Sequence, residues 1–283
     1  MEKGGTMLSE AELQKKWESL TFTDDFIFSR VMRDENICRR LLEMILKVKI
    51  GKIKFLTSQH SIQIEPTAKG IIMDVYLKDK SKVINVEMQT SNHQDLAFRS
   101  RYYQAAADID TTPKGSEYKD LKQNYVIFIC TFDPFYKGKP SYTFQNCCLE
   151  HEEPIYLGDG TTKIFLNTAA KDLSNLDLEL RLFYDYVKGN VAQSDFTQEL
   201  SRSISQIKKE KEERQMYLTY TSRMMESRRD GFEEGLVTGR EEGAYQTKLE
   251  MARKFLSMGL TPEQVVQGTS LPLEQVQEMA QEK

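Results

Sequence analysis

Residues 70–90 constrain the fold of this chain more than any other segment. They read as two apolar strands joined by a short charged turn, with Asp74 in the first strand and Glu87 in the second. Side chains alternate along a strand, so Asn85, Glu87 and Gln89 share one face of the second strand. If the strands pair with these faces together, two carboxylates and an amide meet in one patch. Two bare carboxylates about 4 Å apart repel by roughly 4 kcal/mol at an effective dielectric near 20, and a divalent cation turns that repulsion into a binding site.

A simpler interpretation places Asp74 and Glu87 on the solvent-exposed face of an antiparallel sheet. Many hairpins have an acidic residue in each strand by chance. The segments Ile71–Met73 and Val83–Ile84 weigh against it, because they are apolar almost without alternation. Such runs are typical of strands that are covered on both faces. The helix that follows also supplies side chains that a phosphate-binding cleft needs, namely Arg99, Arg101 and Gln104.

Composition bounds the class of protein. The chain has 283 residues and a net charge of −4, which does not mark a general nucleic-acid binder, although a nuclease needs positive charge only in its cleft. No C-x-x-C pair is present, so we expect free thiols in a reducing cytosol and no zinc site. The N-terminus lacks the apolar segment of a signal peptide, and the longest apolar run, Tyr125–Phe132, is too short to span a membrane. We therefore expect a cytoplasmic protein without membrane contact.

Periodicity predicts a mixed α/β core with a central sheet flanked by helices. Helices are expected over Ser9–Leu20, from a cap at Thr23–Asp25 onward with a break at Asp34–Asn36, and over Asn92–Asp110, Leu176–Val187 and Phe196–Lys211. Strands are expected within 52–65, in the 70–90 hairpin, and over Tyr125–Phe132, Tyr142–Glu150 and Thr162–Leu166. The run Tyr125–Phe132 suits a strand that is buried on both faces. Glu43, in the second helix, is expected to be a solvated surface residue.

The C-terminal part has a different pattern. Tyr217–Met258 is highly charged and helical, yet it carries Gly231, Gly235, Gly239 and Gly243. Four glycines inside a helix cost about 4 kcal/mol relative to alanine, which leaves either a helical interface or a loose tether. Lys248–Glu282 reads as three short helices resembling a helix-turn-helix, but Glu274 and Glu278 would repel phosphate, which favours packing or self-association. The predicted domains are 1–175, a helical extension over 176–247 and a small helical module over 248–283.

The order of several motifs resembles the PD-(D/E)XK nuclease superfamily, and in detail the bacterial Rpn family of recombination-promoting nucleases described as transposases. The matching stretches are Thr23–Phe28, Met73–Tyr76, Asn85–Gln89, Arg99–Tyr103, Asn124–Ile129 with Phe132-Asp133, the glycine repeat and the closing Met251–Met279 segment. The resemblance spans most of the chain. It implies a restriction-endonuclease-like core with a central mixed sheet, followed by a helical tail.

The resemblance also implies roles for individual residues. Asp74 and Glu87 would share a Mg²⁺ ion, with Mn²⁺ as a possible substitute. Gln89 stands where the superfamily usually has lysine, so it offers a neutral hydrogen bond in place of a charge, and Met73 stands where the superfamily has proline. The residues expected to bind substrate are Arg99, Arg101, Tyr103 and Gln104. Arg99 and Arg101 lie two apart on a helix, so only one can face the cleft squarely, and we favour Arg99 with Tyr103 on the same face.

The expected activity is a Mg-dependent DNA endonuclease, linked to recombination or to mobile or foreign DNA. Bound Mg²⁺ would lower the pKa of a coordinated water and neutralise the scissile phosphate. Two alternatives remain open. The first is a catalytically weak DNA-binding protein that keeps the nuclease fold, and the second is a self-associating protein in which the tail is dominant. DNA is the expected partner, together with further copies of the chain bound through the C-terminal helices.

Overall fold

The computed structural model describes residues 9–53, 55–62, 70–150 and 152–281. It separates the chain into two compact units, of which one comprises Ser9–Tyr217 and the other contains the chain from Leu218 onward. The first unit holds the sheet and most of the helices.

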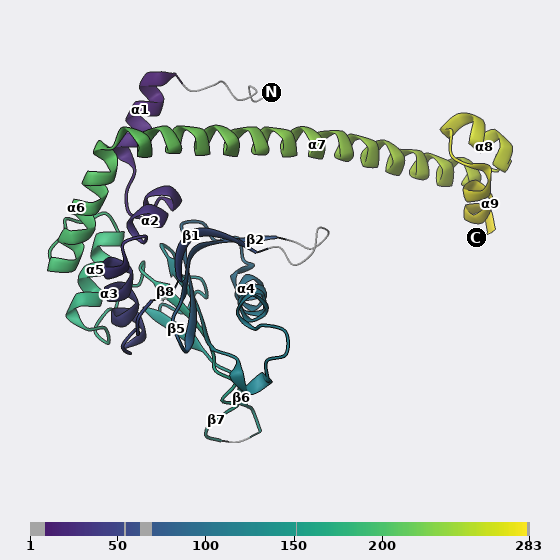
Figure 1. Cartoon of the computed structure of the whole chain (residues 1–283). Helices are drawn as coiled ribbons and strands as arrows, with labels where there is room; N and C mark the ends of the chain where they lie inside the picture. The colour runs from purple at the N-terminus through teal and green to yellow at the C-terminus, as the bar shows by residue number, and fades with distance from the viewer. Residues whose placement is uncertain (1–8, 54, 63–69, 151, 282–283) are drawn as a thin grey trace. The chain divides into compact units, whose positions relative to one another are not determined.

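The first unit begins and ends with runs of helices, and its strands lie between them with α4 after the third strand (Figure 1). Its helices are α1 (Glu10–Ser19), α2 (Asp25–Val31), α3 (Glu35–Leu46), α4 (Leu96–Thr111), α5 (Leu178–Val187), α6 (Asp195–Lys209) and the first turns of α7 (Lys211–Ser257), with a short 3-10 helix at Tyr118–Asp120. Its strands are β1 (Phe55–Ile62), β2 (Ile71–Lys78), β3 (Lys82–Gln89), β4 (Gln123–Cys130), β5 (Ser141–Phe144), β6 (Cys147–Cys148), β7 (Ile155–Tyr156) and β8 (Thr161–Asn167). The predicted break between α2 and α3 is confirmed, because Asp34 accepts the backbone N–H groups of Asn36 and Ile37 and caps α3.

Six strands form one mixed sheet in the order β1-β2-β3-β4-β8-β5. The hairpin β2–β3 is antiparallel, β4 lies parallel to both β3 and β8, and β5 closes the far edge antiparallel to β8. Val126 to Cys130 on β4 are fully buried, as expected for a strand with both faces covered. Figure 1 shows α4 on one side of the sheet and α2, α3, α5 and α6 on the other. The predicted restriction-endonuclease-like α/β architecture is confirmed.

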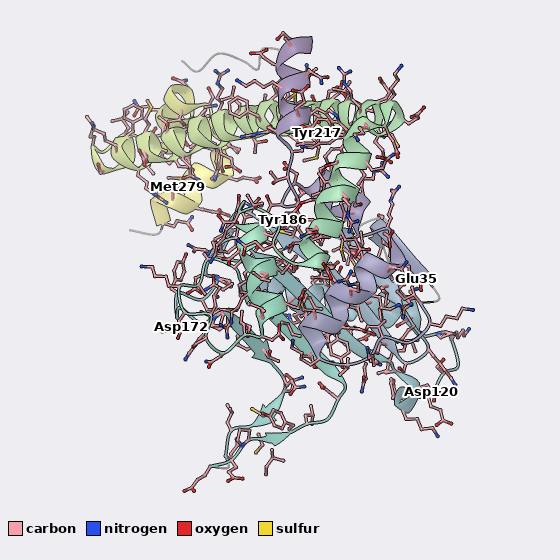
Figure 2. The ribbon with its side chains drawn as sticks, turned by 90° about the vertical axis from the view of Figure 1, so that its left-hand side faces the viewer. Glu35, Asp120, Asp172, Tyr186, Tyr217 and Met279 are labelled. Atoms are coloured by element: carbon pink, nitrogen blue, oxygen red, sulfur yellow. The ribbon has the colours of Figure 1, made fainter. Side chains whose placement is uncertain are left out.

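Aromatic packing joins α5, α6 and the start of α7 to the N-terminal helices. The ring of Phe22 lies 5.4 Å from that of Phe28 and 5.9 Å from that of Phe183. Tyr217, labelled in Figure 2, has its ring centre 5.2 Å from that of Trp17. The segment after residue 175 therefore completes the core of the first unit, and the division between compact units falls after Tyr217.

The segment predicted as one strand over Tyr142–Glu150 is divided in the structure. β5 pairs with β8 in the main sheet, whereas β6 pairs only with β7 in a separate two-stranded ribbon. Gln145 and Asn146 lie between the two strands. Figure 1 shows the ribbon projecting away from the main sheet. Local alternation is the same in both pieces, so the change of pairing partner left no signal in the sequence.

The second unit is helical. α7 runs without interruption to Ser257 and is followed by Gly259 at a φ of +88°, a left-handed conformation that favours glycine. Two short helices, α8 (Pro262–Thr269) and α9 (Leu273–Gln281), then fold back to form a small core. Its buried members are Ala252, Leu256, Val265, Leu271 and Val276. The glycine repeat thus lies inside a continuous helix and does not form a loose tether.

Among the residues that the structure describes, no helix combines enough length with enough apolar character to cross a bilayer.

Candidate active site

Asp74 and Glu87 meet where the ladder between β2 and β3 ends. The paired residues run from Lys78↔Val83 to Val75↔Val86, and the next position along this register sets Asp74 opposite Glu87. The backbone N–H of Asp74 donates to Glu87 Oε1 at 3.2 Å, and the N–H of Met88 donates to Asp74 Oδ2 at 3.1 Å. Each carboxylate thus accepts a main-chain hydrogen bond from the opposite strand, and the fold holds the two acids together.

The environment disfavours charge on both acids. Glu87 is only 2% exposed, and Asp74 is half-buried. Burial and the negative charge of Asp25 raise the pKa of Asp74 to about 7. Burial and the charge of Asp74 raise the pKa of Glu87 well above its usual range. A pair of acids held in this way gains from a bound cation, because the cation removes the repulsion that the fold imposes.

Arg99 supplies the positive charge of the site from the first turns of α4. Its Nη2 lies 3.6 Å from Glu87 Oε2, and its Nη1 donates to Gln89 Oε1 at 2.9 Å. Nη2 also donates to the hydroxyl of Tyr103 at 2.9 Å. The guanidinium lies over the rings of Tyr103 and Phe128, at 5.4 and 5.8 Å from their centres. The side chain is therefore fixed beside the acid pair.

The structure brings together five of the residues that the sequence predicted for the site and leaves two outside it. Asp74, Glu87, Gln89, Arg99 and Tyr103 form one contiguous group. Arg101 instead lies exposed, with its guanidinium 5.9 Å from the ring centre of Phe98. The carbonyl of Gln104 accepts a hydrogen bond from Asn124 at 3.0 Å, away from the acid pair.

Asp25 is an acidic residue that the sequence interpretation did not assign to the site. It is the first residue of α2, and α2 packs against β2. Its negative charge raises the pKa of Asp74, which places it in the electrostatic environment of the pair. The sequence presented it only as a helix cap within Thr23–Phe28. Its relation to Asp74 is a tertiary one, between residues about fifty positions apart, and no local pattern reports it.

Glu43 lies apart from this group. Its carboxylate accepts the N–H of Ile50 at 2.9 Å and contacts Lys49 Nζ at 3.1 Å. These bonds tie the loop after α3 to the helix. The sequence predicted a solvated surface residue at Glu43, whereas its side chain is only 23% exposed and its carboxylate is engaged by these two partners.

A divalent metal fits the donor set of the acid pair. Within the described part of the chain, no group of three or more His, Cys, Asp or Glu side chains has a metal-binding arrangement. Two hard carboxylates are nevertheless what Mg²⁺ commonly takes from a protein, because it keeps several waters and completes its shell with substrate phosphate oxygens. The raised pKa values of Asp74 and Glu87 point the same way, since this pair lacks a full countercharge. Asp74 and Glu87 are the residues that would hold the ion.

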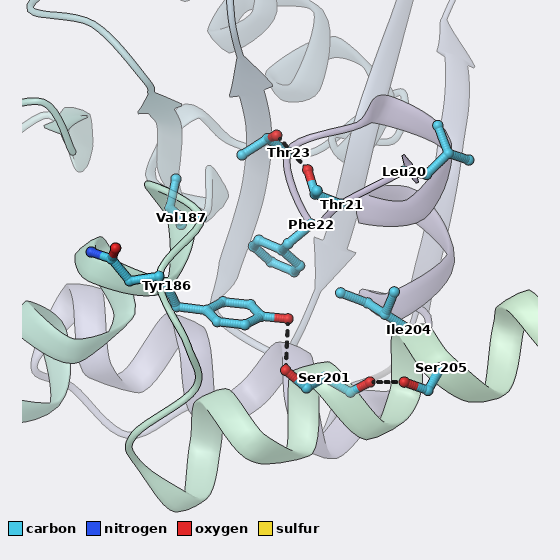
Figure 3. Close-up of a pocket in the computed structure, with 11 residues that line it drawn as sticks. Leu20, Thr21, Phe22, Thr23, Tyr186, Val187, Ser201, Ile204 and Ser205 are labelled. Atoms are coloured by element: carbon cyan, nitrogen blue, oxygen red, sulfur yellow. Dashed lines mark hydrogen bonds between the residues drawn. The ribbon is translucent and has the colours of Figure 1, made fainter. Parts of the chain in front are cut away.

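A well-formed cavity lies elsewhere in the first unit. It has a volume of about 240 Å³ and is lined by residues of the α1–α2 connection, of α5 and its following loop, and of α6, including Phe22, Tyr186 and Ile204 (Figure 3). The hydroxyl groups of Tyr186 and Ser201 are 3.1 Å apart at its wall. Among the described residues that line it, none has a carboxylate or a cationic side chain. Its chemistry does not suit phosphodiester hydrolysis, so the acid pair is the better candidate site.

Comparisons with known proteins agree with a nuclease-type site at the acid pair. A family model described as a PD-(D/E)XK nuclease family transposase matches residues 22–250. No curated protein and no solved structure matches the chain. The family match includes the hairpin, α4 and the helices that cover the sheet. Nucleases of this class typically use divalent metals.

Proposed function

The chain belongs to the PD-(D/E)XK nuclease family transposases, and from that premise we propose that it is a Mg-dependent DNA endonuclease acting in recombination or on mobile or foreign DNA. The observation that carries the proposal is the pair Asp74 and Glu87, held across the open end of the hairpin beside Arg99. The protein would act in the cytoplasm, where its free cysteines stay reduced.

The side chains of this site divide the work of hydrolysis. A divalent ion held by Asp74 and Glu87 would supply an activated water and charge neutralisation at the scissile phosphate. Arg99 would donate to non-bridging phosphate oxygens, where charge develops as water adds to phosphorus and the 3′ oxygen leaves. Gln89 accepts a hydrogen bond from Arg99, which leaves its amide N–H₂ group available to orient substrate. The positive charge that lysine would bring at Gln89 is thus offered by Arg99 from the neighbouring helix.

Plasmid cleavage tests the proposal. Purified protein with Mg²⁺ or Mn²⁺ should nick or cut duplex DNA, and Asp74→Asn and Glu87→Gln should each lower the rate about a hundred- to a thousandfold. Glu43→Gln is a matched control, because its carboxylate serves the loop after α3. If both site variants cut as fast as the parent, the assignment of the site is wrong.

A second candidate function follows from Gln89. A neutral residue at this position favours a DNA-binding protein that keeps the nuclease fold with weak catalysis. Retention of DNA by the parent protein in a gel-shift assay, with no cleavage over a range of Mg²⁺ and Mn²⁺ concentrations, would support this alternative. It would also rule out the endonuclease.

Self-association through the C-terminal helices belongs to the same proposal. A Cβ atom built on any of the repeat glycines of α7 meets nothing within 4 Å. Phe232 and Leu236 lie one helical turn apart on this helix, 71% and 44% exposed. An antiparallel pair of α7 helices centred on Gly235 would set Arg228 and Arg229 of one copy against Glu242 and Glu241 of the other, whereas a parallel pair would set like charges together. The occupant of this face would therefore be a second copy.

Replacing the repeat glycines by alanine distinguishes an effect on self-association from an effect on the stability of the helix. Gly235→Ala with Gly239→Ala should stabilise the helix by about 1 kcal/mol per site, yet weaken association because the added methyl groups block close approach of the backbones. Light scattering coupled to gel filtration gives the mass, and circular dichroism gives the helix content. An unchanged mass in the double variant would dismiss the glycine face as the contact.

A further inference from the structure

Asn85 is a buried side-chain amide that packing alone does not explain. It is 1% exposed, and neither its Oδ1 nor its Nδ2 has a partner of regular hydrogen-bond geometry among the residues that the structure describes. A buried polar group without a close partner destabilises the fold, and native proteins leave few of them. An apolar residue of similar shape would therefore suit this position better if Asn85 served only to fill the core.

Asn85 lies on the face of β3 that carries Glu87. The two residues are two apart along the strand, so their side chains point to the same side of the sheet. The register places Asn85 between Tyr76 of β2 and Val126 of β4, and both of these belong to the apolar cluster that joins the sheet to α4. The amide is therefore set in an apolar layer, with the Glu87 carboxylate next along the same face.

The amide of Asn85 is within reach of the Glu87 carboxylate. Burial and the charge of Asp74 raise the pKa of Glu87, and a loose hydrogen bond with Asn85 is among the interactions that oppose the rise. Glu87 Oε1 accepts the main-chain N–H of Asp74 at 3.2 Å, and Oε2 lies 3.6 Å from Nη2 of Arg99. Asn85 adds a neutral N–H₂ donor from the buried side of the same carboxylate.

We propose that Asn85 is a positioning residue, whose side-chain N–H₂ group donates to the Glu87 carboxylate and fixes it in the orientation that binds a divalent ion. Carboxylates that ligate metals are commonly held by hydrogen bonds from the residues around them. A donor gains strength as the carboxylate becomes charged, because charge-assisted hydrogen bonds are shorter and stronger than neutral ones. The inference rests on the proposed function and adds to it a residue that contacts neither the ion nor the substrate.

Asn124 on the neighbouring strand is a matched control. It is also 1% exposed, and it pairs in register with Val83, two residues before Asn85. Its Nδ2 donates to the carbonyl of Gln104 at 3.0 Å and to Asp108 Oδ1 at 2.8 Å, although its Oδ1 has no partner among the described residues. This amide ties α4 to β4 and serves the fold. Removing the two amides should therefore have opposite consequences.

Leucine substitutions in the full chain separate the two roles. Asn85→Leu should weaken Mn²⁺ binding about 10- to 100-fold, the usual loss when a group that supports a metal ligand is removed. Its thermal unfolding without metal should stay near that of the parent or move to higher temperature, because a poorly paired buried amide is gone. Asn124→Leu should unfold at lower temperature and bind Mn²⁺ as the parent does. The signal of free Mn²⁺ in electron paramagnetic resonance gives the dissociation constants without DNA and without cleavage.

A smaller substitution guards against a leucine that does not fit. Asn85→Ala cannot clash with its neighbours, and it should show the same loss of Mn²⁺ affinity. Parent-like Mn²⁺ affinity in Asn85→Ala would overturn the proposal. An equal loss of affinity in Asn124→Leu would also overturn it, because the effect would then follow the packing of α4. A parent protein that binds Mn²⁺ but cuts no DNA would remove the endonuclease and leave the role of Asn85 standing, whereas a parent that binds no Mn²⁺ would overturn both.

Discussion

Strand β2 takes part in two polar clusters, one at Asp74 and one at Tyr76 and Lys78, and the clusters are built on opposite principles. In the first cluster Asp74 faces Glu87, burial and the charge of Asp25 raise the pKa of Asp74, and burial and the charge of Asp74 raise the pKa of Glu87. In the second cluster Asp110 accepts a hydrogen bond from Tyr76 at 2.9 Å and pairs with Lys78 at 2.7 Å, so its pKa is lowered even though burial opposes this. The first cluster is unfavourable as it stands, and the second is satisfied by the chain itself.

The difference teaches where a ligand is expected. A compensated cluster such as Asp110 with Lys78 and Tyr76 holds α4 on the sheet and needs no further partner. A pair of like charges persists only where the surrounding fold fixes it, and a cation relieves it. Both functional sites and structural ion pairs shift the pKa values of carboxyl groups. Here the direction of the shift separates the two cases on a single strand.

The largest effect is expected when Arg99 is removed. Arg99→Met deletes the donor that joins Glu87, Gln89 and Tyr103, and the cleavage rate should fall about a hundred- to a thousandfold. Arg99→Lys should recover only part of it, because an ammonium cannot reproduce the planar fork that reaches Gln89 and Tyr103 together. Lys78→Met removes a cation from the satisfied cluster around Asp110 and should leave cleavage near the parent rate. Single-turnover kinetics on a duplex oligonucleotide gives the rates, and equal losses at Arg99 and Lys78 would contradict the distinction.

A second prediction compares the same substitution at the two clusters. Without metal at pH 8, Asp74→Asn should stabilise the protein by about 2 kcal/mol, because it removes a charge from a repelling, half-buried pair. The amide oxygen of the introduced side chain would still accept the N–H of Met88. Asp110→Asn should destabilise by about 1 kcal/mol, a figure reduced for solvent screening because this carboxylate is partly exposed. Urea unfolding in EDTA measures both, and shifts of the same sign would mean that the clusters do not differ in the way described.

Of the two clusters, the one at Asp74 and Glu87 could be predicted from the sequence. Asp74 and Glu87 lie on adjacent strands joined by a short turn, so alternation along the strands is enough to bring their faces together. Helical periodicity likewise separates Arg99 and Tyr103 from Arg101, since residues two apart cannot share a face. Both relations join residues close in the sequence, so strand alternation and helical periodicity are enough to predict them. The order of the motifs and the buried run at Tyr125–Phe132 were enough to predict the architecture of the sheet.

The rest depends on tertiary placement. Asp25 comes near Asp74 only because α2 packs against β2, and Tyr76 reaches Asp110 only because α4 packs on the same sheet, against β3 and β4. The split of Tyr142–Glu150 into β5 and β6 depends on which strand each half pairs with. The first unit extends as far as Tyr217 because the ring of Tyr217 packs against that of Trp17. None of these has a signature within a short window of sequence.

The pH dependence of stability offers a third test. The pKa of Asp74 is about 7 in the folded protein and about 4 in an unfolded chain. The folded state therefore binds more protons between about pH 4 and pH 7, and this group's contribution to stability falls as the pH rises through that window. Asp110 has a lowered pKa, so its contribution is complete above about pH 4 and is lost in more acidic solution. Metal-free Asp74→Asn should lose less stability than the parent between pH 5 and 8, and parallel pH profiles for the two proteins would argue against a raised pKa at Asp74.

The last effect, and the most direct, is stabilisation by the metal itself. At pH 8 and a free Mg²⁺ concentration about ten times the dissociation constant, binding to the folded state should add about 1.4 kcal/mol to the free energy of unfolding. The gain should disappear in Asp74→Asn, which has already lost the repulsion that the ion relieves, and it should persist in Asp110→Asn. At pH 5 the gain should be smaller in the parent, because protons then compete with the ion for Asp74. Thermal unfolding followed across a Mg²⁺ titration measures all three proteins, and equal stabilisation of parent and Asp74→Asn would place the ion somewhere other than the open end of the hairpin.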